Sequence, residues 1–129
     1  MVGPRTIDEH ITPRIRRAAT AAERPDPRIL AGVPVCVTDA PERARSFAAE
    51  KLELYGQLPA YRAMLEREGV DGPEGTLAAG SEDAVREQVT TFQAAGATDL
   101  RVAALCPTLG EEERTHAFLH SICAQGNFQ

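Results

Sequence analysis

The stretch that decides the fold is residues 27–50, PRILAGVPVCVTDAPERARSFAAE. Its apolar run at residues 29–37 is too continuous for a strand with one face in water. Such a run is typical of a strand buried on both faces, in a parallel sheet covered by helices. The turn that follows favours the start of a helix, because Asp39 is suited to cap free N–H groups and Pro41 lies in the first turn. The stretch therefore predicts half of a βαβ unit.

Composition narrows the class of protein. The 129 residues suit a single domain with one core. Nineteen acidic against fourteen basic residues give a net charge of −5, which disfavours a nucleic-acid partner because no basic face would neutralise phosphates. No apolar run approaches the ~18 residues of a spanning helix, and the N-terminus lacks the apolar core of a signal peptide. We therefore expect a cytoplasmic protein with no membrane partner.

Helical and strand patterns alternate along the rest of the chain. We expect a helix capped by Thr6 and kinked or broken at Pro13, a strand at 28–37, helices at 41–55 and 59–69, a helix at 81–96, a strand at 98–105 and a helix at 111–123. Residues 70–79 read as a loop with an extended piece at 76–79, and residues 124–129 as a polar tail. Two parallel strands would leave both sheet edges open. Residues 1–129 therefore predict a single, partial α/β domain.

Several motifs occur together in a fixed order. They are the strand end PVCVTD, the segment YGQLPAYRAMLEREG, and the helix start GSED that precedes the strand start GATDL. Over residues 3–122 this order resembles the C-terminal part of the luciferase-like monooxygenase superfamily. Within that superfamily, the chain is most similar to actinobacterial oxidoreductases that depend on coenzyme F-420.

The resemblance implies a (β/α)8 TIM barrel, of which this chain supplies the seventh strand (28–37), the eighth strand (98–105) and their helices. A whole barrel takes about 250 residues, so the earlier strands would be absent. In the family, the groups that contact the cofactor ring and the catalytic acid or base lie mostly in the N-terminal half. The complete enzyme would transfer a hydride between reduced F-420 or FMN and a small organic substrate. We assign no catalytic residue to this chain, and we expect it to be inactive by itself.

Two kinds of partner follow from the open strand edges. One is the missing N-terminal half of the barrel. The other is a second copy of this chain, since two copies could pair their strands as a homodimer. The alternative function is therefore a non-catalytic, self-associating α/β scaffold or interaction protein.

The best candidate for a binding site is the helix start at Gly80 and Ser81. In a barrel, a helix that leads into the eighth strand begins at the catalytic face. Its free N–H groups and dipole would favour a cofactor phosphate or a substrate carboxylate. The other interpretation is that Ser81 only caps the helix, and Glu82 and Asp83 would repel an anion.

Other strand ends carry chemically capable side chains. Asp39 ends the first strand, where a role as a helix cap is the simpler interpretation. Cys106 follows the second strand and reads as a half-buried small residue, since no histidine can be placed beside it as a base. Tyr55, Tyr61 and Met64 suit either core packing, the simpler interpretation, or the wall of a pocket in a complete barrel.

The last predicted helix carries a histidine pair. His116, His120 and Cys123 recur at i, i+4 and i+7, a spacing that could hold a metal ion. The helix lacks a glutamate placed as in HExxH motifs, and its apolar residues favour a partly buried face without ligands. We assign no metal site and keep a metal-binding module as a third alternative.

Overall fold

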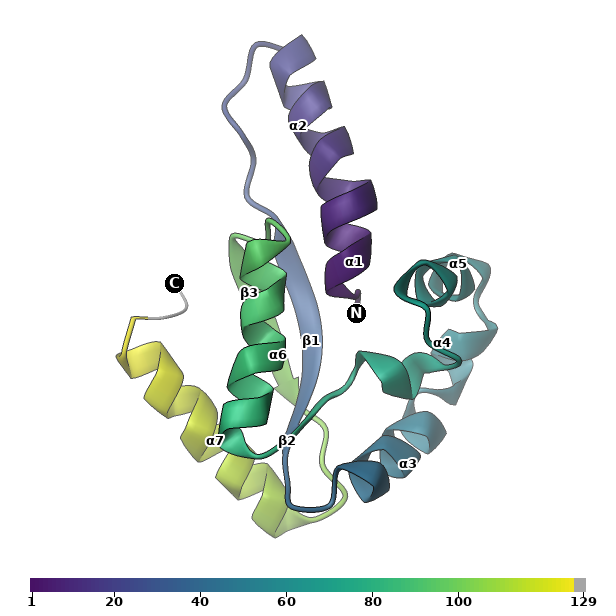
Figure 1. The fold of residues 1–129 in the computed structure, drawn as a ribbon, viewed down its shortest axis with the longest axis vertical. Coiled ribbons are helices and arrows are strands. Elements are labelled where there is room, and N and C mark those ends of the chain that lie inside the picture. Colours follow the sequence, from purple (N-terminus) through teal and green to yellow (C-terminus); the bar gives the residue numbers. More distant parts are fainter. Residues whose placement is uncertain (127–129) are drawn as a thin grey trace.

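The computed structural model describes residues 1–126, in which a small parallel sheet is flanked by helices (Figure 1). Along the chain the elements are α1 (Pro4–Thr6), η1 (Ile7–Ile11), α2 (Thr12–Ala21), β1 (Leu30–Val37), α3 (Pro41–Lys51), α4 (Glu53–Gln57), α5 (Pro59–Glu68), η2 (Pro73–Thr76), β2 (Ala78–Gly80), α6 (Glu82–Ala94), β3 (Asp99–Ala104) and α7 (Leu109–Ala124). The predicted α/β class with parallel strands is confirmed. Of the predicted polar tail 124–129, the first residue ends α7 and residues 127–129 lie outside the described part.

The sheet has three strands in the order β2-β1-β3, and both pairings are parallel. Strand β3 pairs with β1 from Leu30↔Asp99 to Val35↔Ala104, and β2 pairs from Val35↔Ala78 to Val37↔Gly80. The prediction of two strands is therefore wrong. Strand β2 has only three residues, too few to give an apolar period, and it forms because the exposed edge of β1 supplies its partner.

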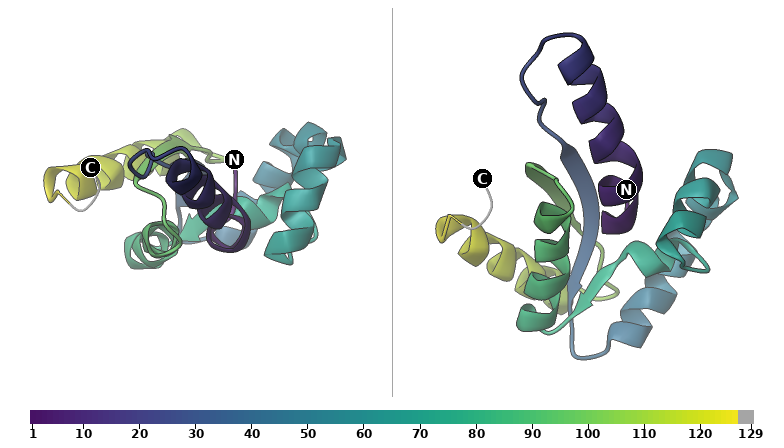
Figure 2. Two further views of the ribbon diagram at one scale, coloured as in Figure 1. Left: turned by 90° about the horizontal axis from the view of Figure 1, so that it is seen from above. Right: turned by 45° about the horizontal axis from the view of Figure 1, so that its top comes forward.

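The connecting helices cover opposite faces of the sheet. The connection from β1 to β2 contains α3, α4, α5 and η2, and the connection from β2 to β3 contains α6, so the two connections cross the sheet in opposite directions. Right-handed crossovers then place α3 and α6 on different faces, as in doubly wound sheets. Figure 2 shows α3 and α6 on different sides of β1.

The larger core lies on the face that α6 and α7 cover. Alternate residues of β1, including Val33, Val35 and Val37, pack there against apolar side chains of both helices. The residues from the helices are Val85, Val89, Phe92, Phe118, Leu119 and Ile122. A smaller core on the opposite face joins Cys36 to Ala44 and Ala48 of α3.

Only the carboxyl half of β1 is buried on both faces. Val35, Cys36 and Val37 are completely buried, as the sequence predicts. Nearer the start of the strand the burial alternates, and the Leu30 side chain is 66% exposed. Helix α3 reaches only the end of the strand, so the amino half of this face is open. We call this surface, formed by Leu30, Gly32 and Pro34 of β1 with Arg101 and Ala103 of β3, the open face.

The N-terminal helix begins earlier than predicted. Gly3 is its N-cap, and Thr6 lies inside the helix and donates its backbone N–H to Glu68 of α5 at 2.6 Å. The prediction that Thr6 caps this helix is therefore wrong, and Glu9, which would complete a capping box with Thr6, pairs with Arg5 instead. The helix does not break at Pro13. The π-helical turn η1 comes just before this proline, and α2 continues through it. In Figure 1 the end of α2 projects beyond the sheet.

The middle helices differ from prediction at one boundary. The helix expected at 41–55 ends at Lys51, and α4 follows with Gly56 inside it rather than after it. Gly69 ends α5 as predicted, in the left-handed conformation (φ 72°) that glycine adopts without steric cost. Met64 and Leu65 of α5 are buried, whereas Tyr61 is half-buried.

Candidate functional site at the carboxyl end of the sheet

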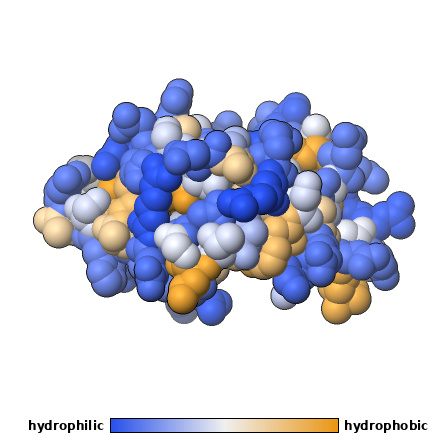
Figure 3. Space-filling view, turned by 90° about the horizontal axis from the view of Figure 1, so that it is seen from below, coloured by the Kyte–Doolittle hydropathy of each residue, from blue (hydrophilic) through white to orange (hydrophobic). Residues whose placement is uncertain are grey.

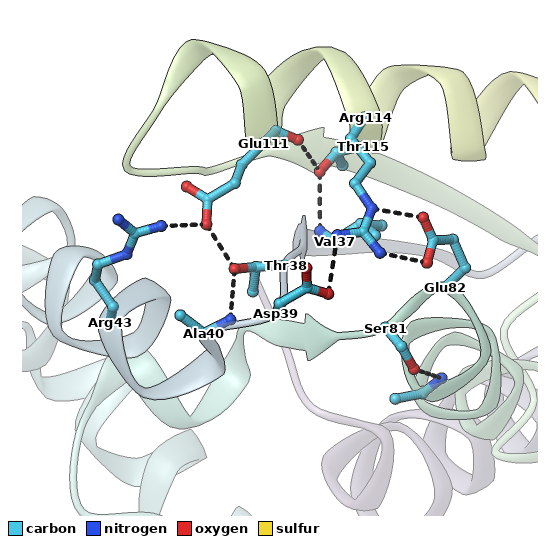
Figure 4. Close-up of polar contacts among 11 residues, drawn as sticks. Val37, Thr38, Asp39, Ala40, Arg43, Ser81, Glu82, Glu111, Arg114 and Thr115 are labelled. Atoms are coloured by element: carbon cyan, nitrogen blue, oxygen red, sulfur yellow. Dashed lines mark hydrogen bonds and ion pairs between the residues drawn. The ribbon is translucent and has the colours of Figure 1, made fainter.

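Three chain segments meet where the parallel strands end. They are residues 38–40 after β1, Gly80 and Ser81 at the end of β2, and residues 105–108 after β3. In open parallel sheets and in barrels alike, ligands bind at this end of the strands. Figure 4 shows that α7 lies across this end and directs side chains toward the strand termini.

Glu111 of α7 joins three elements. Its Oε1 accepts hydrogen bonds from Thr38 Oγ1 at 2.5 Å and from Arg43 of α3 at 2.7 Å, and its Oε2 accepts from Thr108 Oγ1 at 2.7 Å (Figure 4). Partial burial alone would raise the pKa of the Glu111 carboxyl. The donors from Thr38, Thr108 and Arg43 outweigh that effect, and the pKa is lowered. Glu111 is therefore ionised and bound on both oxygens.

Arg114, one turn further along α7, binds two acids. Its Nε and Nη2 each donate to one oxygen of Glu82 at 2.7 Å, and its Nη1 donates to Asp39 at 3.1 Å (Figure 4). The Arg114 hydrogen bonds lower the pKa of Glu82 to about 2, and they raise the pKa of the guanidinium itself. This two-point pairing is the strongest geometry for an arginine and a carboxylate. We call Arg43, Arg114 and their three acids the ion-pair network.

Thr115 fixes the same helix to the last residue of β1. Its Oγ1 accepts the Val37 N–H at 2.9 Å, donates to the Glu111 carbonyl at 2.7 Å, and lies 3.3 Å from Cys106 Sγ. Cys106 is half-buried, as predicted. Burial, and then the neighbouring Cys106 thiol, raise the pKa of Cys36, so this thiol is not an activated nucleophile.

The predicted anion site at Gly80 and Ser81 lies beside this network. Ser81 Oγ accepts the Ala84 N–H at 3.3 Å, so it caps α6. The Glu82 carboxylate occupies the first turn of the helix, where it is held by Arg114. The helix start therefore already has a negative charge from the chain, and an anion bound there would compete with Glu82 for Arg114. Anion binding at Gly80 and Ser81 stays a prediction.

The other sequence candidates are placed differently from expectation. Asp39 does not cap α3: it pairs with Arg114, and Thr38 Oγ1 accepts the Ala40 N–H instead. His116, His120 and Cys123 are exposed on α7, so the expectation of a partly buried face is wrong. Within residues 1–126, no three side chains among histidine, cysteine, aspartate and glutamate come together in a way that could hold a metal ion.

Sequence reasoning missed most of the ion-pair network. Glu111 reads only as favourable charge at a helix start, and nothing in the pattern of α7 marks Arg114 or Thr115. One signal was present: Thr108 and Glu111 form a T-x-x-E capping box, and Thr108 Oγ1 accepts the Glu111 N–H at 3.3 Å. The partners of these residues on other elements, such as Thr38 for Glu111 and Glu82 for Arg114, lie more than 30 positions away, so local patterns do not reveal them.

The network does not fit a cofactor phosphate. Its two arginines are already paired with acids, and Glu82 and Asp83 stand at the α6 start. Viewed from this end, the surface is mostly hydrophilic with separate hydrophobic patches (Figure 3). The arrangement joins α3, α6 and α7 to the strand ends, and we derive no catalytic step from it.

Fold and site together define a small parallel α/β domain with an ion-paired carboxyl end. Comparison with protein-family models, with curated proteins and with solved structures finds no match. Among the described residues, no helix has the length and apolar character needed to cross a membrane.

Proposed function

We propose that the chain is the C-terminal part of a luciferase-like oxidoreductase that depends on F-420 or a flavin such as FMN, and that it is not catalytic by itself. In the complete enzyme, a hydride would pass between the reduced cofactor and a small organic substrate. The observation that carries this proposal is the open face of β1 and β3, opposite the helices α6 and α7.

The open face, which lies on the same side of the sheet as α3 but beyond its reach, supports the barrel assignment. In a (β/α)8 barrel, helices cover the outer face of adjacent parallel strands and the inner face meets other strands. Here β1 and β3 are adjacent and parallel. Helices α6 and α7 pack on one of their faces, which would be the outer face of a barrel. Their other face carries the small residues Gly32, Pro34 and Ala103, which leave room for side chains from further strands.

The β1 edge that faces away from β3 also supports a missing neighbour. Strand β2 pairs only with residues 35–37 of β1. Residues 30–34 of that edge have no strand partner within the described part of the chain. A preceding barrel strand would use this edge, with β2 remaining at the carboxyl end.

Supplying the missing half tests the proposal. The chain would be co-expressed with the first six strands of an F-420-dependent luciferase-like oxidoreductase. We expect a one-to-one complex by size exclusion with light scattering, and F-420 binding, followed by fluorescence, that neither half shows alone. The matched variant is Ala103→Glu. Ala103 is exposed in the isolated chain, so the variant should fold normally, but a completed barrel would bury its charge.

Two results would contradict this assignment. One is the absence of any complex although both halves are folded. The other is a complex that forms equally well with Ala103→Glu, which would show that the open face is not the contact surface.

Self-association is the second candidate, and the exposed edge of β3 favours it. The N–H groups of Asp99 and Leu105 donate to β1. The residues between them alternate in direction, so the N–H of Ala104 points to the free edge of β3. Light scattering should report a dimer, and Ala104→Pro should convert it to a folded monomer, because proline blocks edge pairing without removing a bond to β1. A monomer at all concentrations would exclude this function.

A further inference from the structure

A cavity of about 370 Å³ lies between the open face and the helices α4 and α5. Its floor is formed by Gly32, Pro34 and Ala103, and its walls include Tyr55, Tyr61 and Arg101. The cavity borders Gly32 to Pro34 of β1 and Arg101 and Ala103 of β3, and none of the residues of the ion-pair network lines it. Its size falls in the range of sites for small organic ligands.

The floor and one wall are suited to a flat apolar group. Gly32 has no side chain and Met1 lies against it, with its nitrogen 3.3 Å from where a Cβ would be, while Pro34 and Ala103 add small apolar surfaces on the same face. Across from the sheet, the Tyr55 and Tyr61 rings meet edge to face, with centroids 5.0 Å apart and planes at 78°. The tyrosines and Pro34 all line the cavity, so an aromatic ring that entered it would meet aromatic and apolar surface.

Arg101 and the N-terminal amino group of Met1 give the cavity its positive charge. Arg28, Arg43 and Arg114 each pair with an acid, whereas the Arg101 guanidinium has no hydrogen-bond or ion-pair partner among residues 1–126. No aspartate or glutamate lines the cavity, although the chain is acidic overall. A free guanidinium beside an apolar floor presents a fork of donors to a planar anion.

We propose that this cavity binds a small aromatic carboxylate, with the ring between the tyrosines and Pro34 and the carboxylate on Arg101. The proposal goes beyond the oxidoreductase assignment and does not depend on it, since it concerns the chain as it stands. The ligand class follows from one unpaired guanidinium, an apolar floor and an aromatic wall.

The test compares two probes that share a ring system, 2-naphthoate and the neutral 2-naphthalenemethanol. Binding would be followed by ¹H–¹⁵N NMR on the whole chain. We expect shifts at the amides of Gly32, Arg101 and Ala103. We also expect naphthoate to bind up to about fivefold more tightly than the alcohol, the factor that a solvent-accessible ion pair provides.

Variants separate the specific ion pair from the net charge. Arg101→Gln should reduce the preference for naphthoate, with the amino group of Met1 still in the lining, and leave the affinity for the alcohol unchanged. Arg17→Gln on the exposed part of α2 makes the same change in net charge and should leave both affinities unchanged. Tyr61→Ala should weaken both probes.

Three outcomes would overturn the proposal. The first is equal affinity of the wild-type chain for the two probes. The second is an equal loss of naphthoate binding in both arginine variants, which would indicate attraction by net charge alone. The third is a set of shifted amides outside β1, β3, α4 and α5. Because Arg101 is exposed and has no partner among the described residues, its variant is expected to fold, which circular dichroism would verify.

Discussion

The Thr115 hydroxyl accepts the N–H of Val37 at 2.9 Å, across 78 positions of sequence, and so attaches the end of the central strand β1 to helix α7. The same hydroxyl donates to the Glu111 carbonyl. Thr115 and Val37 are both completely buried. This bond ends the β1 ladder at the point where the chain turns toward α3, and it sets the position of α7 and of the ion-pair network that α7 carries.

Thr115→Val should destabilise the fold. The substitution preserves shape but leaves the Val37 N–H buried without an acceptor, which costs about 1–3 kcal/mol. Urea denaturation would measure the loss. Thr115→Ser keeps the hydroxyl and should lose only about 1 kcal/mol, for the missing methyl group. Equal losses in the two variants would show that the hydroxyl is not what holds α7.

Acid should weaken the domain through Glu82. Its folded pKa of about 2 lies below the ordinary value of 4.5, so its contribution is fully present above pH 4.5 and is lost as the pH falls toward 2. Glu111 and Asp99, whose pKa values are also lowered, add in the same direction. Glu82→Gln should make stability less dependent on pH in this window.

The loss from Glu82→Gln at neutral pH should be about 1 kcal/mol, since the pair is partly exposed to solvent. Glu112→Gln is the control, because it removes the same charge at an exposed position of α7. It should leave the pH dependence of the free energy of unfolding as in the wild type. If stability fell with pH in the same way in both variants and in the wild type, the role given to Glu82 would be contradicted.

Gly80 should not tolerate a side chain. Its φ of 137° is a conformation that residues with a Cβ rarely adopt, and an added Cβ would lie 3.0 Å from Ala84 Cβ. Gly80→Ala should therefore cost about 1–3 kcal/mol. Gly110→Ala, in open space on α7, should be neutral or stabilising by up to about 1 kcal/mol. Thermal unfolding of the two variants side by side tests the contrast, and equal melting temperatures would refute it.

Two buried threonines should respond in opposite directions to the same substitution. Thr6 Oγ1 is buried and has no hydrogen-bond partner in the described structure, so Thr6→Val should stabilise the fold by about 1 kcal/mol. Thr12 Oγ1 donates to the Ala95 carbonyl at 3.2 Å, so Thr12→Val should destabilise it by about 1 kcal/mol. Denaturant midpoints would show the sign of each change. A loss of stability in Thr6→Val would mean that its hydroxyl has a partner.

The three cysteines should differ in reactivity. Cys123 is exposed, Cys106 is half-buried, and Cys36 is completely buried with a raised pKa. Alkylation by iodoacetamide, followed by mass spectrometry, should modify Cys123 first and Cys36 only after unfolding. Modification of Cys36 at the rate of Cys123 would show that the sheet end opens readily.

Much of the secondary structure could be predicted from local pattern. The apolar run of β1, the serine cap of α6 with Val85 and Val89 one turn apart, and the glycine that ends α5 all lie where the sequence places them. Each of these signals depends on residues within a few positions of one another. Backbone geometry and burial of one face act over that range.

The errors share a cause. The capping box at Thr6 is overridden by Glu68, and the cap expected from Asp39 is overridden by Arg114. In both cases a polar group that could satisfy a local partner is instead bound by a residue far away in the sequence. Local rules cannot rank such competitors, because the distant partner is brought near only when the helices pack.

The sequence by itself therefore determines the parallel α/β class, the central strand and most helices, because their hydrophobic periods and end signals are local. The tertiary structure alone decides that β2 joins the sheet, that α7 supplies the residues of the ion-pair network, and that the amino half of one sheet face stays open. These features depend on which surfaces remain unpaired once the helices have packed. That outcome is set by contacts between elements rather than within them.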